Sequence, residues 1–130
     1  MKTELLYLAL AAAFTGLLWI PYILDRVLVW GLIDSVGYPE SPKPQSMWAQ
    51  RLKKAHANAV ENLVVFAVLM LLAVSMGMTG GALATAAMLY FWARVVHAGA
   101  YTLGLPWIRT LAFVAGFAAQ VMVALQLLGR

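Results

Sequence analysis

Four long apolar runs alternate with short polar, proline-rich or glycine-rich segments along the chain. About 20 consecutive apolar residues suffice to cross the hydrocarbon core of a membrane. The pattern therefore predicts an all-α fold, an integral membrane four-helix bundle, formed by a single domain over residues 1–130. We expect the spans at residues 5–33, 47–77, 82–102 and 107–128.

Helix-breaking residues set the ends of these expected spans. Pro21 should kink the first span or end one half of it, because proline lacks the backbone N–H. The segment Asp34–Ser46 has three prolines within six residues, which predicts a water-exposed loop. Ser46 is a suitable cap for the helix that follows. Glycines near residue 80 and the Gly104–Pro106 segment predict the two remaining turns.

Composition strengthens the membrane assignment. Hydrophobic residues make up 64% of the chain and charged residues 11%, whereas soluble domains have about 45–50% and about 25%. These values exclude a soluble globular domain, and also a disordered chain, which needs many charges. The absence of cysteine excludes disulfides, cysteine metal sites and a protein thiol nucleophile. A metal site is not expected, because His97 has too few candidate ligands around it.

The positive charges indicate how the spans are oriented. The net charge is +4, and no basic run is longer than Lys53–Lys54, so nucleic-acid binding is not expected. Basic residues concentrate near the 1–2 and 3–4 connections, which the positive-inside rule places in the cytoplasm with both termini on the opposite side. A signal peptide is the competing interpretation of the first run, which is too long for one. The basic residues are Arg26, Lys43, Arg51, Lys53, Lys54, Arg94 and Arg109.

Polar residues inside apolar helices suggest a binding site. Such residues are costly in lipid and usually face the bundle interior. Helical spacing places the second span's polar residues on one face and the third span's on another, and Arg109 adds a third wall. The resulting cationic pocket would suit a small ligand with several carboxylates and an amine, with Glu61 accepting the amine. The two stripes are Arg51, Lys54, Asn58 and Glu61, and Tyr90, Arg94, His97 and Tyr101.

Purely structural roles are possible for the same residues. Glu61 and Arg94 could form an ion pair that makes both charges tolerable in the bilayer. The basic residues could simply mark the membrane interface, and Tyr90 and Tyr101 could belong to an interfacial aromatic belt. A non-catalytic protein that binds lipid or a partner is therefore the alternative to an enzyme. A small drug exporter is less favoured, because Leu5–Leu24 contains no acidic residue.

Two segments resemble motifs of the MAPEG family, the membrane-associated proteins in eicosanoid and glutathione metabolism. RLKKAHANAVENLVVF resembles the second-helix signature, with its basic, Asn and Glu residues at Lys54, Asn58 and Glu61. ARVVHAGAYTLGLPWIRTLAF resembles the region from the end of the third helix to the start of the fourth. The resemblance is to a bacterial-type member, so we expect the bacterial inner membrane. The second segment's matching residues are Arg94, His97, Tyr101, Arg109 and Thr110.

The resemblance implies a homotrimer in membrane lipid, with glutathione bound between neighbouring subunits near the cytoplasmic face. It implies that the second-span residues bind the peptide on one subunit and that the third and fourth spans form the other wall. Arg109 would stabilise the thiolate and Thr110 would donate a hydrogen bond to it. The implied function is a glutathione-dependent transferase or peroxidase acting on a hydrophobic small molecule. Glutathione supplies the thiol, so the missing cysteines are no obstacle.

The chain departs from the eicosanoid-type enzymes of that family at three positions. Lys54 stands where those enzymes have an arginine, and Ala57 stands where they often have a second basic residue. Phe113 stands where an aromatic hydroxyl is expected. Lysine is a point charge and cannot form the bidentate contacts of arginine, so these departures predict weaker glutathione binding or a different thiol ligand.

Overall fold

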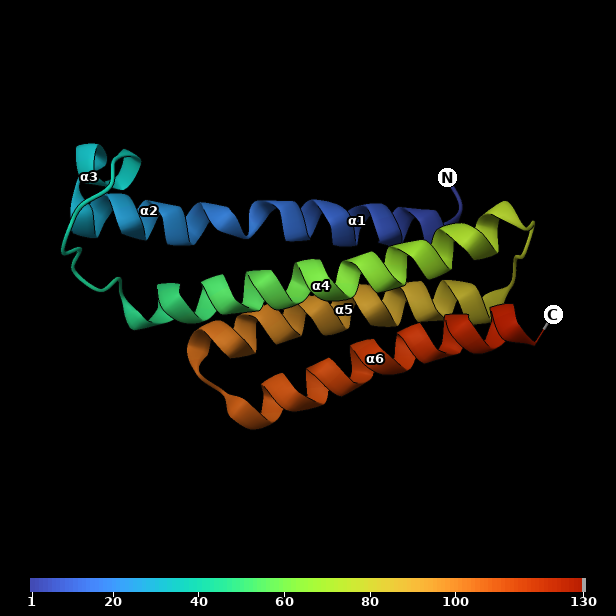
Figure 1. Cartoon of the computed structure of the whole chain (residues 1–130). Helices are drawn as coiled ribbons and strands as arrows, with labels where there is room; N and C mark the ends of the chain where they lie inside the picture. The colour runs from blue at the N-terminus through green and yellow to red at the C-terminus, as the bar shows by residue number, and fades with distance from the viewer. Residues whose placement is uncertain (130) are drawn as a thin grey trace.

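The computed structural model describes residues 1–129, and the described part is helical throughout apart from short connections. Four long rods lie side by side, the first of them formed by α1 and α2 end to end (Figure 1). Both chain ends and the α4–α5 turn lie at one end of the bundle, and α3 and the α5–α6 turn at the other. The expected all-α membrane bundle is confirmed. The helices are α1 (Thr3–Leu17), α2 (Trp19–Trp30), α3 (Leu32–Val36), α4 (Met47–Ser75), α5 (Gly81–Leu103) and α6 (Pro106–Leu128).

The first rod breaks at Leu18, one turn before Pro21. Proline cannot donate to the carbonyl four residues earlier, and its ring crowds that carbonyl. The carbonyl in question belongs to Leu17, the last residue of α1. Leu18 keeps helical backbone angles, φ −65° and ψ −21°, so the two halves stay nearly in line. The proline therefore ends one half of the rod, which is one of its two expected effects.

A second break lies at Gly31 and corrects two expectations. Gly31 has φ +82°, a conformation that glycine adopts at little cost. It ends α2 at Trp30, so the first rod does not continue without interruption to residue 33. The expected loop from residue 34 also starts too early, because α3 extends to Val36. The prolines that prevent a helix begin only at Pro39.

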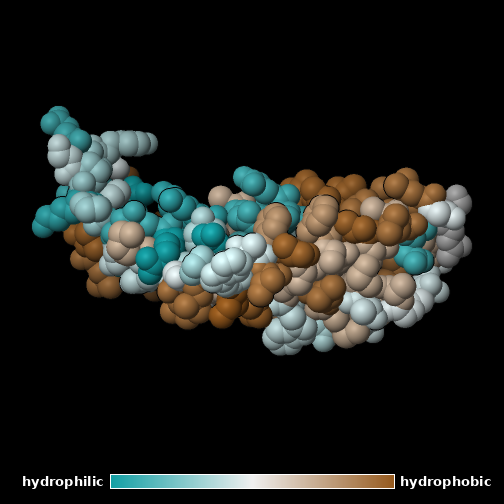
Figure 2. Space-filling model, turned by 90° about the horizontal axis from the view of Figure 1, so that it is seen from below, coloured by the Kyte–Doolittle hydropathy of each residue, from teal (hydrophilic) through white to brown (hydrophobic). Residues whose placement is uncertain are grey.

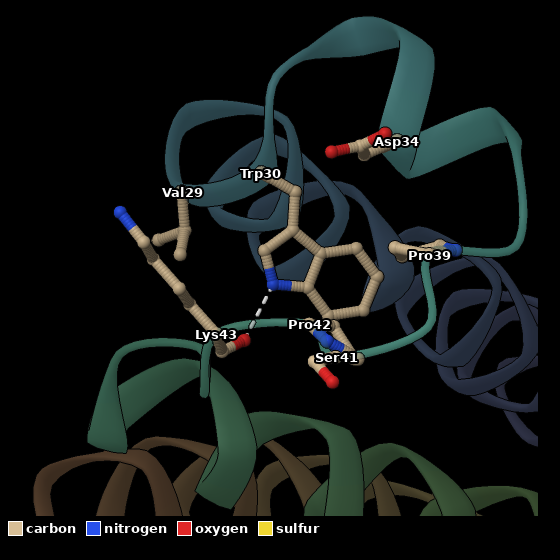
Figure 3. Close-up of a pocket in the computed structure, with 7 residues that line it drawn as sticks. All are labelled: Val29, Trp30, Asp34, Pro39, Ser41, Pro42 and Lys43. Carbon is tan, nitrogen blue, oxygen red and sulfur yellow. Dashed lines mark hydrogen bonds between the residues drawn. The ribbon is translucent and has the colours of Figure 1, made fainter.

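The remaining connection folds back onto Trp30 (Figure 3). The indole Nε1 of Trp30 donates to the carbonyl of Lys43 at 2.6 Å. The Arg26 guanidinium carbon lies 4.4 Å from the centroid of the Trp30 ring, a cation–π contact. Pro39 and Pro42 line a small pocket together with Trp30 and Lys43. These contacts attach the connection to α2 and fix the approach to α4.

The start of α4 is held by a carboxylate from α2. Ser46 occupies the cap position, as expected, but its side chain makes no capping bond to α4. Its hydroxyl donates to Asp25 Oδ1, and its backbone N–H donates to Asp25 Oδ2 at 3.0 Å. Gln45 Nε2 adds a bond to Asp25 Oδ2 at 3.3 Å. A buried carboxylate needs such donors, and a hydrogen bond to an ionised acceptor is stronger than one between neutral groups.

The core lies along α5, which packs against α1, α4 and α6. Buried alanines such as Ala86 and Ala87 allow close approach of neighbouring helices. Phe66 of α4 stacks on Tyr90 of α5, with ring centroids 4.0 Å apart and planes within 3°. Tyr90 is thus a core residue, which corrects its possible place in an interfacial belt.

The surface is that of a membrane protein. Three segments are long and apolar enough to cross a membrane: Thr3–Trp30, Met47–Ser75 and Pro106–Leu128. Helix α5 is 23 residues long and lies among them, with Arg94 and His97 on its buried face. Figure 2 shows hydrophilic side chains gathered towards the end that carries α3 and its connection, and hydrophobic side chains covering much of the rest.

Candidate functional site

A cleft opens where α5 turns into α6, and one residue of α4 reaches into it. We call it the α4–α6 cleft. Its position is set by Gly104, which ends α5 in a left-handed conformation with φ +74°, and by Pro106 at the start of α6. The lining residues are Asn58, His97, Tyr101, Arg109, Thr110 and Phe113.

The two polar stripes meet at one contact behind this cleft. Arg94 Nη2 donates to Asn58 Oδ1 at 2.6 Å. The Arg94 side chain is only 3% exposed, and its Nε has no hydrogen-bond partner among the described residues. The stripes of α4 and α5 therefore face each other within one chain. The family resemblance implies that Asn58 and Arg94 belong to opposite walls of a site between subunits, and the contact shows that these two residues also meet within one chain.

Glu61 lies on the outer face of α4, away from this contact. It is exposed, and within residues 1–129 it makes no ion pair with Arg94. Its neighbours Val60 and Val64 are 45% and 60% exposed. The Glu61–Arg94 ion pair considered from the sequence is therefore absent within the described chain, because Glu61 points about 60° away from Asn58 around the axis of α4, towards the outer face.

Aromatic rings hold the cation of the cleft in place. The Arg109 guanidinium carbon lies 5.1 Å from the Tyr101 ring centroid, a cation–π contact. The Tyr101 ring meets the His97 ring edge-on with centroids 5.6 Å apart, and the Phe113 ring is tilted against His97 with centroids 6.2 Å apart. His97 is buried, and its Nδ1 has no hydrogen-bond partner within the described chain. Arg109 thus stands at the cleft over a packed aromatic support.

Thr110 uses its hydroxyl proton locally. Its Oγ1 donates to the carbonyl of Pro106 at 2.9 Å, one turn earlier in α6. In this rotamer the oxygen can accept a hydrogen bond from a ligand but cannot donate one. The donor role implied by the resemblance therefore requires the hydroxyl to turn away from Pro106.

Two more of the expected binding residues lie outside the cleft, in addition to Glu61 and to Arg94, which lies behind it. Arg51 Nε donates to the carbonyl of Thr102 at 2.9 Å, and its guanidinium lies beside Gly104. Arg51 thus secures the end of α5. Lys54 lies in a separate groove that it shares with Trp30, Lys43 and Lys53. Neither side chain lines the α4–α6 cleft.

Two further polar residues connect with the cleft and were not among the expected site residues. Gln120 of α6 is buried, and its Nε2 donates to Asn62 Oδ1 at 3.2 Å. Asn62 in turn donates to Asn58. A carboxamide within an apolar run is the sequence signal that could have found them, since such a group must find a partner when buried.

Comparison with known proteins settles the family. A family model described as the MAPEG family matches residues 7–129, which cover all four rods of the bundle except the first turn of α1. The chain belongs to the MAPEG family. The resemblance found in the second and third spans is thereby confirmed. A search of curated proteins gives no match for this MAPEG chain.

Proposed function

We propose that this MAPEG protein is a membrane-bound glutathione-dependent transferase or peroxidase. The observation that carries the proposal is the setting of Arg109 in the α4–α6 cleft. Its guanidinium lies over Tyr101, Asn58 and His97 line the same cleft, and no carboxylate lines the described cleft. A cation without a carboxylate partner, next to hydrogen-bond donors, favours an anionic ligand. Glutathione offers two carboxylates and a thiol.

The proposed chemistry depends on the charge of Arg109. A free thiol has a pKa of about 8.5 and is mostly protonated at neutral pH. A nearby guanidinium favours the thiolate, and lowering the thiol pKa by two units corresponds to about 2.7 kcal/mol. The thiolate sulfur then bonds to an electrophilic carbon, and the leaving group departs with its bonding pair. With a peroxide, the thiolate sulfur attacks one oxygen, the O–O bond breaks and the alcohol leaves after taking up a proton, which gives a glutathione sulfenic acid. The thiol of a second glutathione then attacks the sulfenic sulfur, water leaves and the disulfide forms.

A homotrimer in the membrane is part of the same proposal, and it rests on the outer face of α4. Val60, Val64 and Val68 are 45%, 60% and 54% exposed along this face, and Glu61 lies among them. A carboxylate facing lipid is costly, so a neighbouring subunit is a better cover for Glu61. Such packing would direct Glu61 and Lys54 towards the next subunit, where they could add to its glutathione site.

The proposed orientation follows the charges at the two ends of the bundle. The α3 connection and the α5–α6 turn lie at one end, away from both termini (Figure 1). This end includes Lys43 and Arg109. The positive-inside rule supports a cytoplasmic position for it. The inner membrane of a bacterium is the proposed location, and a hydrophobic small molecule dissolved in the lipid is the proposed second substrate.

Conjugation of glutathione to a chlorinated aromatic electrophile by the purified protein in detergent tests the function. Removing one group that stabilises a developing charge typically lowers kcat by about 100-fold or more. We expect such a loss in kcat/KM for Arg109→Ala. Lys53→Ala, an exposed cation outside the cleft, is the control and should stay within about twofold of the parent on the same scale. Conjugation no faster than in Arg109→Ala, together with no glutathione binding, would reject the proposal.

The second candidate is a non-catalytic lipid- or partner-binding protein of the same fold. It is favoured by the Thr110 hydroxyl, whose proton is used by Pro106, and by Phe113, which has no hydroxyl. The two candidates differ in their response to glutathione. A rise in melting temperature with added glutathione supports the enzyme, whereas no shift, with a trimer destabilised by Glu61→Gln, supports the second candidate.

A further inference from the structure

Three carboxamides and one guanidinium form a hydrogen-bonded chain through the interior of the bundle. Gln120 Nε2 donates to Asn62 Oδ1 at 3.2 Å and to the Asn62 carbonyl at 3.3 Å. Asn62 Nδ2 donates to Asn58 Oδ1 at 3.2 Å and to the Asn58 carbonyl at 2.9 Å. Arg94 Nη2 closes the chain on Asn58 Oδ1 at 2.6 Å. We call these four residues the amide relay; they join α4, α5 and α6.

The guanidinium decides the direction of every bond in the amide relay. An arginine side chain has five N–H donors and no acceptor, so Asn58 must turn its oxygen towards Arg94. Asn62 must then present its NH₂ group to that oxygen, which leaves its own oxygen for Gln120. Reversing any one amide would place two donors or two acceptors face to face. The fixed charge of Arg94 therefore fixes the orientation of amides on both α4 and α6.

The chain ends at the α4–α6 cleft. Asn58 lines this cleft, whereas Asn62 and Gln120 do not. The oxygen of Asn58 accepts two bonds, from Arg94 and Asn62, and its Nδ2 has no hydrogen-bond partner in residues 1–129. A carboxamide nitrogen is a donor only, so Asn58 offers the cleft an N–H that suits an acceptor oxygen.

We propose that Asn62 and Gln120 are positioning residues that hold the Asn58 amide so that its NH₂ group donates to a carboxylate oxygen of the ligand. This inference rests on the proposed glutathione site and adds a determinant of its specificity. Gln120 is only 7% exposed, and it reaches the cleft solely through Asn62. With Arg94 as its one partner, the Asn58 amide could swing about its Cβ–Cγ bond and carry the NH₂ group away from the ligand, whereas the second donor from Asn62 fixes the plane of the amide. The amide relay prevents that rotation and reduces the ordering required on binding.

Binding of glutathione and two analogues tests the inference. Each analogue has one of the two carboxylates of glutathione converted to its amide. Dissociation constants are measured by calorimetry for the parent, Asn62→Leu and Gln120→Met, which keep side-chain size. Gln126→Met is the matched control, because Gln126 is an exposed glutamine on the same helix. Loss of one charge-assisted hydrogen bond predicts about tenfold weaker glutathione binding for both relay variants, and less than about twofold for the control.

The analogues separate positioning from stability. For one of the two analogues, the relay variants should weaken binding by less than about twofold, because its charge-assisted hydrogen bond with Asn58 is already lost. The double variant, Asn62→Leu with Gln120→Met, should bind glutathione with an affinity no lower than that of the single variant that binds it less tightly. Equal weakening for glutathione and both analogues would mean a general structural defect and would overturn the inference.

A second measurement keeps the inference distinct from the proposed function. Side-chain NH₂ signals of Asn58 in ¹⁵N-labelled protein report the orientation of its amide without any ligand. Gln120→Met should shift these signals, whereas Gln126→Met should not. An unchanged Asn58 signal in Gln120→Met overturns the relay even if glutathione binds. Absence of glutathione binding by the parent, with a shifted signal, rejects the proposed function and the ligand role of Asn58 but retains the relay.

Discussion

Asp25 of α2 accepts hydrogen bonds from both the backbone N–H and the hydroxyl of Ser46, the residue immediately before α4. Asp25 is only 5% exposed. One side chain thus fixes the position at which the second rod begins relative to the first. Asn58 lies in α4, so this contact also contributes to the placement of the cleft.

The first prediction concerns this contact. Asp25→Ala removes the acceptor of two bonds from Ser46 and one from Gln45. Hydrogen bonds to a charged group are worth about 2 kcal/mol each, and buried donors left without partners add to the loss. We expect a marked fall in melting temperature in detergent. Asp34→Ala, which removes an exposed carboxylate of α3, should leave it nearly unchanged; equal effects of both variants would contradict the role of Asp25.

The second prediction concerns the stack of Tyr90 on Phe66. The Tyr90 hydroxyl is buried without a partner among the described residues, so Tyr90→Phe should be neutral or stabilising. Tyr90→Ala removes the whole ring from the stack and should destabilise the protein by about 3–5 kcal/mol. Unfolding followed by thermal shift in detergent distinguishes these outcomes. A fall in stability for Tyr90→Phe close to that for Tyr90→Ala would show that the hydroxyl has a partner.

The third prediction separates Arg51 from glutathione binding. Arg51 holds the Thr102 carbonyl and lies against Gly104 at the end of α5. Arg51→Met keeps much of the aliphatic stem but loses that bond, which is worth about 1–3 kcal/mol for a charged donor. We expect a lower melting temperature and a glutathione dissociation constant within about twofold of the parent. A tenfold weaker affinity at unchanged stability would instead make Arg51 a ligand-binding residue.

The fourth prediction tests the outer face of α4 as the surface of self-association. Val68 of α4 and Val114 of α6 are 54% and 55% exposed. Replacing either valine with tryptophan keeps the surface apolar and adds bulk. Val68→Trp should obstruct a subunit contact and yield species smaller than a trimer. The Val114→Trp protein should remain trimeric, because we expect the Val114 side chain to face lipid. Light scattering coupled to size-exclusion chromatography gives the masses; a trimer for Val68→Trp would exclude this part of α4 from the interface.

Much of the fold could be predicted from particular residues. The four apolar runs gave the number of rods, and Pro21 and the Gly104–Pro106 segment marked breaks that the structure contains. The apolar pattern does not mark Gly31 as a break, although its positive φ ends α2. An isolated glycine between apolar residues is compatible with a continuous helix, and only the path of the chain back towards α4 requires the break.

The candidate site could be predicted in part. Helical spacing placed Asn58 and Arg94 on polar stripes, and the structure brings these two residues into contact. Spacing also grouped Glu61 with Asn58, although one is exposed and the other lines the cleft. Residues three apart on a helix differ by about 60° in direction. That difference is enough to place one towards α5 and the other on the outer surface.

The sequence by itself determined that this is a helical membrane protein, that it has four long rods, and which side chains carry its rare charges. These properties follow from local composition and from the fixed period of a helix. Only the tertiary structure decided which part of each polar stripe faces inward, that Asp25 holds the start of α4, and that Gln120 connects with Asn58 through Asn62. These relationships join residues up to 58 positions apart. They depend on how the helices are rotated against one another. The packing of the small residues of α5 sets this rotation, and local sequence patterns do not encode it.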